Sequence, residues 1–360
     1  MGYFCHDRRT ILLTEGDAAT RKAEIKSYFN ATMSIFERLH DLFNCSEAFF
    51  AKHETLRHPP IFYVGHTATF YMNKLILGKF LKTRIDPLLE MQTAVGVDEM
   101  SWDDLDTDHY AWPSEEECRK DPKLAHEFLG RCIEYRFKLR AVVNDLIDKT
   151  PLVMPIREND FWYIILMGIE HDRIHLETSS VILRQAPLSV MRPSPHFQSC
   201  PHGKFSSCPD SEIARKSPAN KLLDVPATTI TLGRKWEDAS YYGWDNEFTS
   251  EPREISMGKF QASQFLVSNF EYYQFVKDGG YQTQKYWPEM GWKWVTEMSI
   301  KHPLFWRVSS EGEYKLRVMD KEITMPWDWP VECNNHEGAA FCAWKAEKSG
   351  KNTRLLSEHE

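Results

Sequence analysis

The chain has 360 residues, of which 42% are hydrophobic, and a net charge of −8 at pH 7. This length is enough for two domains with full cores, and the composition is that of a globular protein that folds without disulfides. The 44 basic side chains are scattered among 52 acidic ones. The sequence therefore offers no basic stripe for nucleic acid or for an anionic membrane, and it favours small molecules as partners.

The cysteine pattern and the N-terminal residues indicate the cellular compartment in which the protein is expected. The eight cysteines form no C-x-x-C pair, and the first residues, MGYFCHDRRTILL, lack the apolar core of a signal peptide. No apolar run reaches the roughly 18 to 20 residues of a membrane span. We therefore expect a reducing, cytoplasmic location. Cys200, His202 and Cys208 lack a fourth ligand and paired spacing, which argues against a zinc knuckle.

Four segments have helical periodicity and predict a four-helix bundle. Pro60 and Pro122 mark two of the helix starts, because proline is tolerated where a backbone amide has no intrahelical partner. The sequence therefore predicts where these helices start more firmly than where they end. The segments span residues 18–44, 60–82, 122–148 and 159–185.

Three histidines in two of these helices predict a metal site. His171 and His175 lie four residues apart, so their rings sit one above the other with Cβ atoms about 5–6 Å apart. His66, on the second helix, can face the same bundle axis. Gly168, one turn before His171, predicts open volume over the rings. The alternative is that each histidine is a satisfied core or surface residue, since pairs at this spacing also arise by chance.

Two acidic residues near the pair are weaker candidates for the site. Glu177 lies about 200° around the helix from His175, so we expect it to pack nearby rather than to bind the same ion. Asp172 completes an H-D-x-x-H string close to the zinc-peptidase H-E-x-x-H, in which the carboxylate is the general base. That reading needs a downstream third ligand, and the sequence identifies none.

The connection between the second and third helices is acidic and aromatic. A solvated loop is one interpretation, and a segment that caps a site is the other, because the aromatic side chains need somewhere to pack. Its acidic residues are Asp98, Glu99, Asp103, Asp104, Asp106 and Asp108, and its aromatic residues are Trp102, Tyr110 and Trp112.

The composition changes after the bundle. Six prolines and seven serines fall within residues 187–218, which predicts a linker. Nine of the twelve tryptophans follow residue 222, among short strand-like pieces and one helix that Ser268 can cap. We therefore predict a helix bundle over residues 1–190, a linker over 191–221 and an α+β domain over 222–360.

Both halves resemble known modules. The first is similar to DinB-type four-helix bundles, whose members commonly bind a divalent metal through a histidine on the second helix and an H-x3-H pair on the fourth; His66, His171 and His175 match these positions. The second half, with YYGWDNEF, FVKDGGY, YWPEMGWKW and RLLSEHE, resembles the formylglycine-generating-enzyme domain, which has a C-type-lectin-like fold. The fold class implied is an α bundle followed by an incomplete α+β domain.

That order of modules resembles the sulfoxide synthases of thiohistidine biosynthesis. The resemblance implies a non-haem Fe(II) enzyme that uses O₂ to join a cysteine sulfur to an imidazole carbon. VGVDEMSWDDL and HDRIHLETS look most like the ovothiol branch, which converts L-cysteine and L-histidine to 5-histidylcysteine sulfoxide. The ergothioneine branch often has glutamine where this chain has Ile174. Without the resemblance, three histidines suit Zn²⁺, Ni²⁺ or Cu²⁺ equally well.

An amino-acid substrate needs cationic partners for its carboxylate. Arg136 and Arg140, one turn apart on the third helix, are the predicted substrate-binding residues, and an ordinary solvated helix face is the alternative. The final RLLSEHE is similar to an interior string of the family, so we expect a truncated enzyme whose active-site tyrosine and methyltransferase module lie beyond Glu360. The competing interpretations are a DinB-type thiol S-transferase or hydrolase, and a non-catalytic metal-binding paralogue. The oligomeric state is left open.

Overall fold

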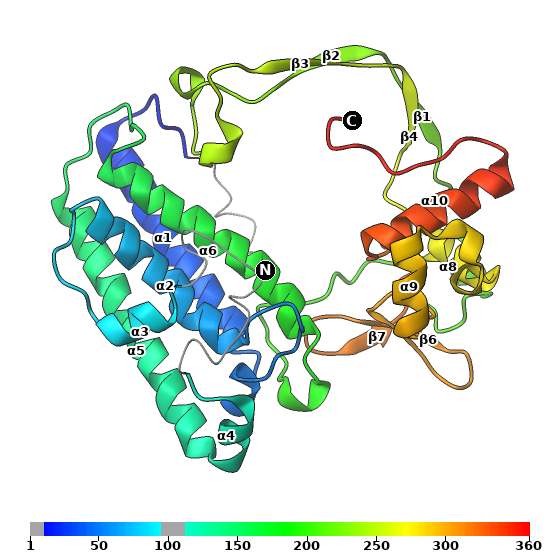
Figure 1. Ribbon diagram of the computed structural model, residues 1–360, viewed down its shortest axis with the longest axis horizontal. Coiled ribbons are helices and arrows are strands. Elements are labelled where there is room, and N and C mark those ends of the chain that lie inside the picture. Colours follow the sequence, from blue (N-terminus) through cyan, green and yellow to red (C-terminus); the bar gives the residue numbers. More distant parts are fainter. Residues whose placement is uncertain (1–10, 95–111) are drawn as a thin grey trace. The chain divides into compact units, whose positions relative to one another are not determined.

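The structure is a computed structural model that describes residues 11–94 and 112–360. The chain forms two compact units (Figure 1). Unit 1 comprises Met1–Phe197 and Gly233–Glu251, and unit 2 comprises Gln198–Leu232 and Pro252–Glu360. The acidic segment 98–108, interpreted from sequence as a loop or a cap, lies outside the described residues.

Unit 1 is built on four long helices, as the periodicity predicted. Helices α2 and α5 begin at their predicted prolines, and Asp17 caps α1 by accepting a hydrogen bond from the Thr20 amide. Each long helix packs against two of the others: α1 and α2 both contact α5 and α6. The helices are α1 (Ala18–His40), α2 (Pro60–Leu77), α5 (Pro122–Lys149) and α6 (Phe161–Arg184).

Short helices connect the long ones. Of these, α3 matters most for the site, because it follows α2 and packs against it. Asp86 caps α3 and Pro87 occupies its first position. The connecting elements are η1 (Glu47–Phe49), α3 (Pro87–Gln92) and α4 (Glu115–Lys120), and three further short helices follow α6 in unit 1: η4 (Leu188–Val190), η5 (Trp236–Asp238) and η6 (Asp245–Glu247).

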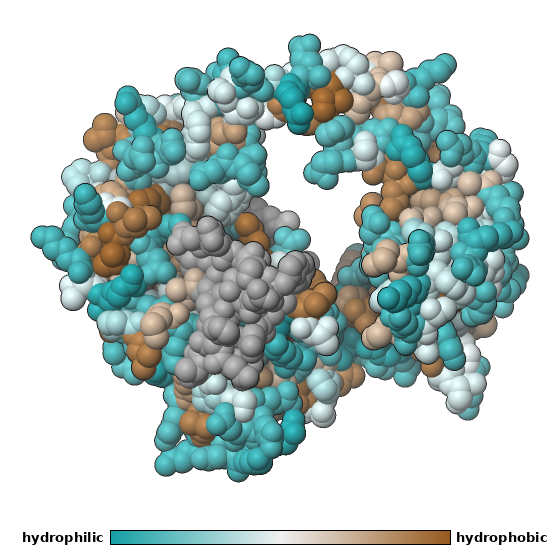
Figure 2. Space-filling model, viewed as in Figure 1, coloured by the Kyte–Doolittle hydropathy of each residue, from teal (hydrophilic) through white to brown (hydrophobic). Residues whose placement is uncertain are grey.

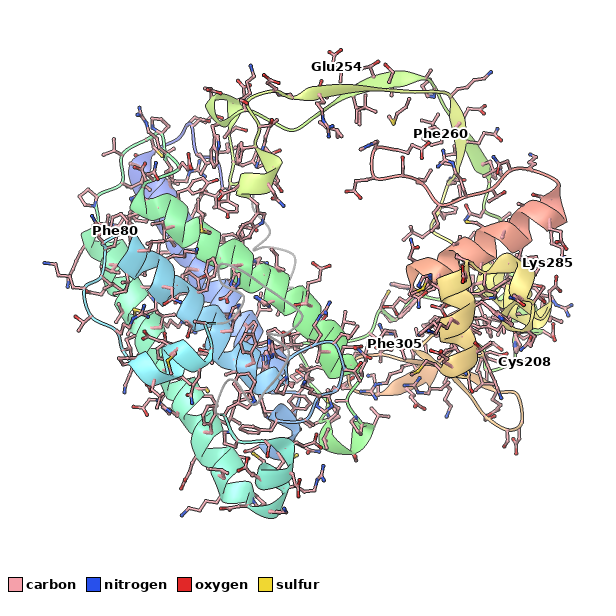
Figure 3. The ribbon with its side chains drawn as sticks, viewed as in Figure 1. Phe80, Cys208, Glu254, Phe260, Lys285 and Phe305 are labelled. Carbon is pink, nitrogen blue, oxygen red and sulfur yellow. The ribbon has the colours of Figure 1, made fainter. Side chains whose placement is uncertain are left out.

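Unit 2 combines small antiparallel sheets with short helices. Strand β1 (Leu222–Val225) pairs with β4 (Phe260–Ser263), and β2 (Thr228–Leu232) pairs with β3 (Arg253–Met257); Glu254 and Phe260 mark this ribbon in Figure 3. A three-stranded sheet has the order β5–β6–β7. Its strands are β5 (Trp306–Val308), β6 (Tyr314–Arg317) and β7 (Glu322–Thr324), and the helical elements are α7 (Glu212–Arg215), α8 (Asn269–Lys277), η7 (Gly280–Gln282), η8 (Gln284–Tyr286), α9 (Glu289–Glu297) and α10 (Asn335–Ser349).

Aromatic side chains fill the core of unit 2. Ser268 caps α8 as expected, and Asn269 at its first position is fully buried. The Asn269 amide donates to the Pro326 carbonyl at 2.9 Å and its oxygen accepts from the Trp306 indole at 3.0 Å, so this polar group is satisfied on both sides. The largest core side chains are Tyr272, Phe275, Tyr281, Trp287, Trp306, Trp327, Phe341 and Trp344.

The two units divide the sequence differently from the predicted partition. Within residues 198–221, the Ser206 carbonyl accepts a hydrogen bond from the Trp327 indole at 2.8 Å, so that part of the predicted linker belongs to unit 2. Residues 233–251 leave unit 2 at the end of β2 and pack in unit 1 before β3 begins. Residues 233–251 contain five aromatic side chains and the flanking strands β2 and β3 contain none, but this difference in composition does not indicate in which unit the segment packs.

Hydrophilic residues cover most of the surface visible in Figure 2, with apolar residues in small groups between them. None of the helices within residues 11–94 and 112–360 is long and apolar enough to cross a membrane.

Candidate metal centre

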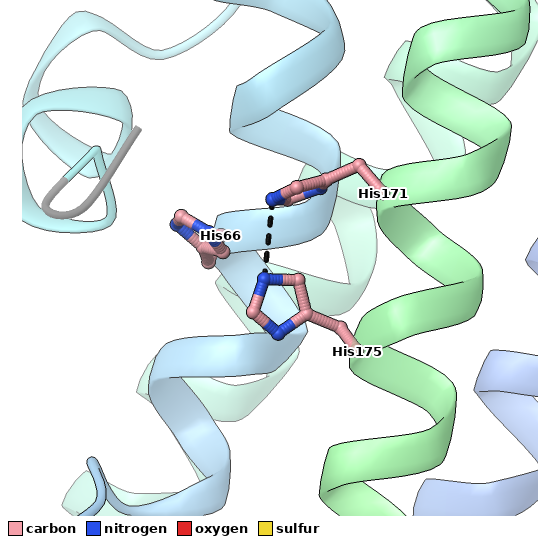
Figure 4. A group of neighbouring side chains, drawn as sticks. All are labelled: His66, His171 and His175. Carbon is pink, nitrogen blue, oxygen red and sulfur yellow. Dashed lines mark hydrogen bonds between the residues drawn. The ribbon is translucent and has the colours of Figure 1, made fainter. Parts of the chain in front are cut away.

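The structure brings the three predicted histidines together (Figure 4). His66 comes from the middle of α2, and His171 and His175 come from successive turns of α6. One ligand atom from each lies within 4.8 Å of the other two, and the Nε2 atoms of His171 and His175 are 3.1 Å apart. Among the described residues, no other group of three His, Cys, Asp or Glu side chains converges in this way. Cys200, His202 and Cys208 accordingly form no such group.

Aromatic rings fix the orientation of the imidazoles. Phe70 stacks on His171 with ring centroids 3.8 Å apart and planes within 10° of each other. Phe62 stacks on His66 at 4.7 Å. Phe62 also contacts the buried indole of Trp112, which lies just before α4 in the connection between α2 and α5. The rings are therefore held in place by packing before any ion binds.

The tautomer of His66 is set by a backbone carbonyl. Its Nδ1 atom lies 2.8 Å from the oxygen of Thr93, the residue that ends α3. Because a carbonyl only accepts, Nδ1 must carry the proton, and Nε2 keeps its lone pair for a ligand. Neither the periodicity nor the histidine spacing indicates Thr93; the only related sequence signal is Asp86-Pro87, which marks the start of the helix that Thr93 ends.

Burial keeps the three imidazoles neutral. It lowers the pKa of His66 to about 4, against a smaller opposing effect of the Thr93 carbonyl. Burial, and to a lesser extent the neighbouring His66, lower the pKa of His175 to about 3. The pKa of His171 is also well below its usual value, because of burial and the other two histidines. Neutral imidazole is the form that binds a metal ion, so all three are ready to act as ligands at pH 7.

A buried polar cluster lies behind the histidines. Asp172, adjacent to His171, has no exposed surface, and burial raises its pKa to about 6 against the opposing effects of Arg136 and Thr67. Arg136 donates to the hydroxyl of Thr67 and to the carbonyl of Val64. These hydrogen bonds connect α5 to α2, and the Arg136 charge acts on Asp172 of α6. It leaves Asp172 in the interior of the bundle rather than among the converging ligand atoms.

The two arginines predicted to bind substrate both make contacts within the bundle. Arg136 is 3% exposed. Arg140 donates to the side chains of Asn30 and Ser34, each at 2.9 Å. Both arginines line a groove of about 360 Å³ between α1, η1, α2 and α5, to which none of the three histidines contributes. Binding of a substrate carboxylate by Arg136 and Arg140 stays a prediction.

The expectation of open volume next to Gly168 is wrong. A Cβ atom on this glycine would lie 2.0 Å from a ring carbon of Tyr71, which is fully buried, so the small residue makes room for a tyrosine of α2. Glu177 is exposed and outside the histidine group, in agreement with the helical geometry.

The fold and site define a helix-bundle protein with three convergent histidines, joined to a small α+β unit. No family model matches the sequence. The chain is 31% identical over 124 residues to ergothioneine biosynthesis protein 1 of Neurospora crassa, covering 31% of this chain and 12% of that protein. It is 32% identical over 91 residues to the hercynine oxygenase of Mycobacterium tuberculosis, covering 25% of this chain and 21% of that one.

A longer match extends across most of the chain. Ergothioneine biosynthesis protein 1 of Schizosaccharomyces pombe is 22% identical over 333 residues, which is 81% of this chain and 36% of that protein. The chain is thus distantly related to these biosynthetic proteins and to hercynine oxygenases, and it spans well under half of the length of each.

Proposed function

We propose that the chain holds the non-haem Fe(II) centre of an O₂-dependent sulfoxide synthase that joins the sulfur of L-cysteine to the imidazole of L-histidine. Unit 1 would then be a DinB-like bundle, and unit 2 part of a formylglycine-generating-enzyme-like domain. The observation that carries the proposal is the convergence of His66, His171 and His175 in a chain related to hercynine oxygenases.

The donor set fits a divalent ion. With metal–nitrogen bonds of about 2.1 Å, two imidazole nitrogens at a right angle lie about 3.0 Å apart, close to the 3.1 Å between the Nε2 atoms of His171 and His175. His66, His171 and His175 would hold the ion, and the chemistry that it would supply is to bring a thiol, an imidazole and O₂ together at one place. His171 and His175 each keep some exposed surface, whereas His66 is buried.

The protein's own contribution is positioning and proton control. The stacked rings of Phe62 and Phe70 hold the ligands and shield one side from water. Gathering three reactants in one place converts a termolecular encounter into a local rearrangement. The overall reaction breaks the cysteine S–H bond and one imidazole C–H bond, forms C–S and S=O bonds, and reduces O₂, with one oxygen atom leaving as water.

The preference for free histidine is the finer part of the proposal. Ile174 precedes the second histidine of the pair and is 45% exposed on α6. Its side chain is apolar and has no dipole to direct at a quaternary ammonium. The ergothioneine branch often has glutamine at this position, and the amide oxygen of glutamine can lie against a trimethylated amino group, which itself forms no hydrogen bond.

Reconstitution with Fe(II) under anaerobic conditions tests the proposal. We expect one tightly bound ion per chain in the wild type and none in His171→Ala, and O₂-dependent formation of a histidine–cysteine sulfoxide by mass spectrometry. Trimethylated histidine should react more slowly than L-histidine. The Ile174→Gln variant should reduce this difference in rate between the two substrates. Product formation without O₂ uptake would instead support the thiol S-transferase or hydrolase, and equal iron content in the wild type and His171→Ala would overturn the proposed centre.

A further inference from the structure

Unit 1 contains a second cavity, lined by none of the three histidines. Its volume is about 450 Å³, within the range of small-molecule sites. It lies between α1, α6 and the excursion 233–251. The residues that the argument uses are Tyr28, Glu170, Arg173, Tyr242, Trp244 and Glu247.

The wall formed by residues 233–251 is fixed in place. The Tyr163 hydroxyl donates to the Gly243 carbonyl at 2.7 Å, which attaches the excursion to α6. Arg234 donates to the Tyr242 carbonyl at 3.0 Å. A Cβ atom on Gly243 would lie 1.7 Å from the Nη2 atom of Arg234, so a side chain at this position would displace the guanidinium from its bonds to Tyr242 and Glu247. The cavity is therefore preformed, as ligand sites usually are.

Groups of opposite charge face each other along one side of α6. Glu170 accepts a hydrogen bond from the Tyr28 hydroxyl at 3.0 Å. Arg173, one turn later, uses Nε to bond Thr32 and lays its guanidinium over the Tyr28 ring at 4.5 Å. Its Nη2 atom has no hydrogen-bond acceptor among the described residues. An anionic oxygen near Arg173 would satisfy this donor.

The opposite wall is aromatic and carries a second carboxylate. Tyr242 and Trp244 pack edge to face with centroids 5.3 Å apart. The Tyr242 hydroxyl is buried without a hydrogen-bond partner among the described residues, and burial together with nearby acidic groups raises its pKa. Glu247 accepts from Arg234 at 3.0 Å at the same wall. Flat apolar surface thus adjoins both a cationic and an anionic group.

We propose that this cavity binds a free α-amino acid with an aromatic or imidazole ring. Its carboxylate meets Arg173, its ammonium meets Glu170, and its ring lies against Tyr242 and Trp244. A zwitterion satisfies both charges at once, whereas a simple cation leaves Arg173 unpaired and a simple anion is repelled by Glu170 and Glu247. The site is independent of the proposed iron chemistry, because it needs neither the ion nor the three histidines.

Calorimetric titration of metal-free His171→Ala with L-histidine tests the cavity without the metal site. We expect saturable binding at one site per chain. Histamine, which lacks the carboxylate, and imidazole propionate, which lacks the ammonium, should each bind at least tenfold more weakly. L-Phenylalanine should bind within about tenfold of L-histidine, because the ring is recognised by its face.

Variants on α6 provide the matched comparison. Arg173→Gln and Glu170→Gln, added separately to the same background, should each weaken binding of L-histidine at least tenfold. Glu177→Gln, on the exposed part of the same helix, should leave binding unchanged. Circular dichroism checks that each variant is folded. The proposal is overturned if L-histidine does not bind, if histamine binds equally well, or if Arg173→Gln binds as tightly as its parent.

Discussion

The Nδ1 atom of His66 lies 2.8 Å from the backbone oxygen of Thr93, so the end of α3 orients a proposed metal ligand on α2. The Thr93 hydroxyl holds this carbonyl in place, with 2.8 Å contacts to the Leu89 carbonyl and to the Thr69 hydroxyl. Partners of this kind orient a ligand and raise its basicity, and their loss typically weakens metal affinity 10- to 100-fold.

Thr93→Val should therefore weaken metal binding roughly tenfold, because it removes both hydroxyl contacts while keeping the shape of the side chain. Thr93→Ser keeps the hydroxyl and should bind nearly as tightly as the wild type. Titration with Co²⁺, followed by its visible absorption, measures both affinities. Equal affinities for the Val and Ser variants, with melting temperatures unchanged, would show that the Thr93 side chain does not support the ligand.

Arg136→Met should destabilise unit 1 strongly. The change removes the hydrogen bonds to Thr67 and Val64 and the nearby positive charge that opposes the rise in the Asp172 pKa. Leaving a buried polar group without its partner costs about 1–3 kcal/mol. Urea unfolding measures the loss, and Arg136→Met with Asp172→Asn should recover part of it. If Arg136 instead binds substrate, the single change raises KM and leaves the free energy of unfolding nearly unaltered.

His40 should make stability depend on pH. Burial lowers its pKa to about 4, from the ordinary value near 6.5, and only the Phe36 carbonyl opposes this. Between these values the unfolded chain binds the proton more readily than the folded one, so the free energy of unfolding falls as pH drops below about 6.5. From pH 7.5 to pH 5 the wild type should lose about 2 kcal/mol more than His40→Phe. Urea unfolding of the wild type and of His40→Phe at both pH values measures this loss of stability. An identical pH dependence of the two proteins would contradict the prediction.

Gly168→Ala should destabilise the bundle by about 1–3 kcal/mol, since the added methyl overlaps the Tyr71 ring and a close-packed core resists extra volume. Gly130→Ala is the matched control on α5, because nothing lies within 4 Å of the added methyl there. That change should be neutral or stabilise the protein by up to about 1 kcal/mol. Thermal unfolding of the two variants gives the comparison, and a neutral Gly168→Ala would mean that Tyr71 can move aside.

Local signals in the sequence were enough to predict the long helices and the pair on α6. Two signals act over only a few residues: proline at the starts of α2 and α5, and the apolar periodicity of the helices. Both can therefore be recognised from the sequence alone. The spacing of His171 and His175 fixes their side-by-side arrangement, because helical geometry determines it. The short helix α8 was predictable for the same reason, through its cap at Ser268.

The sequence by itself therefore determined where the long helices lie and that His171 and His175 share one face of a helix. Only the tertiary structure decided that the Thr93 carbonyl meets His66, that Tyr71 fills the space at Gly168, and that residues 233–251 join unit 1. Every residue has a backbone carbonyl, so no residue type indicates which one will accept a bond. Contacts between distant segments depend on how whole elements pack, and this information is spread over many residues.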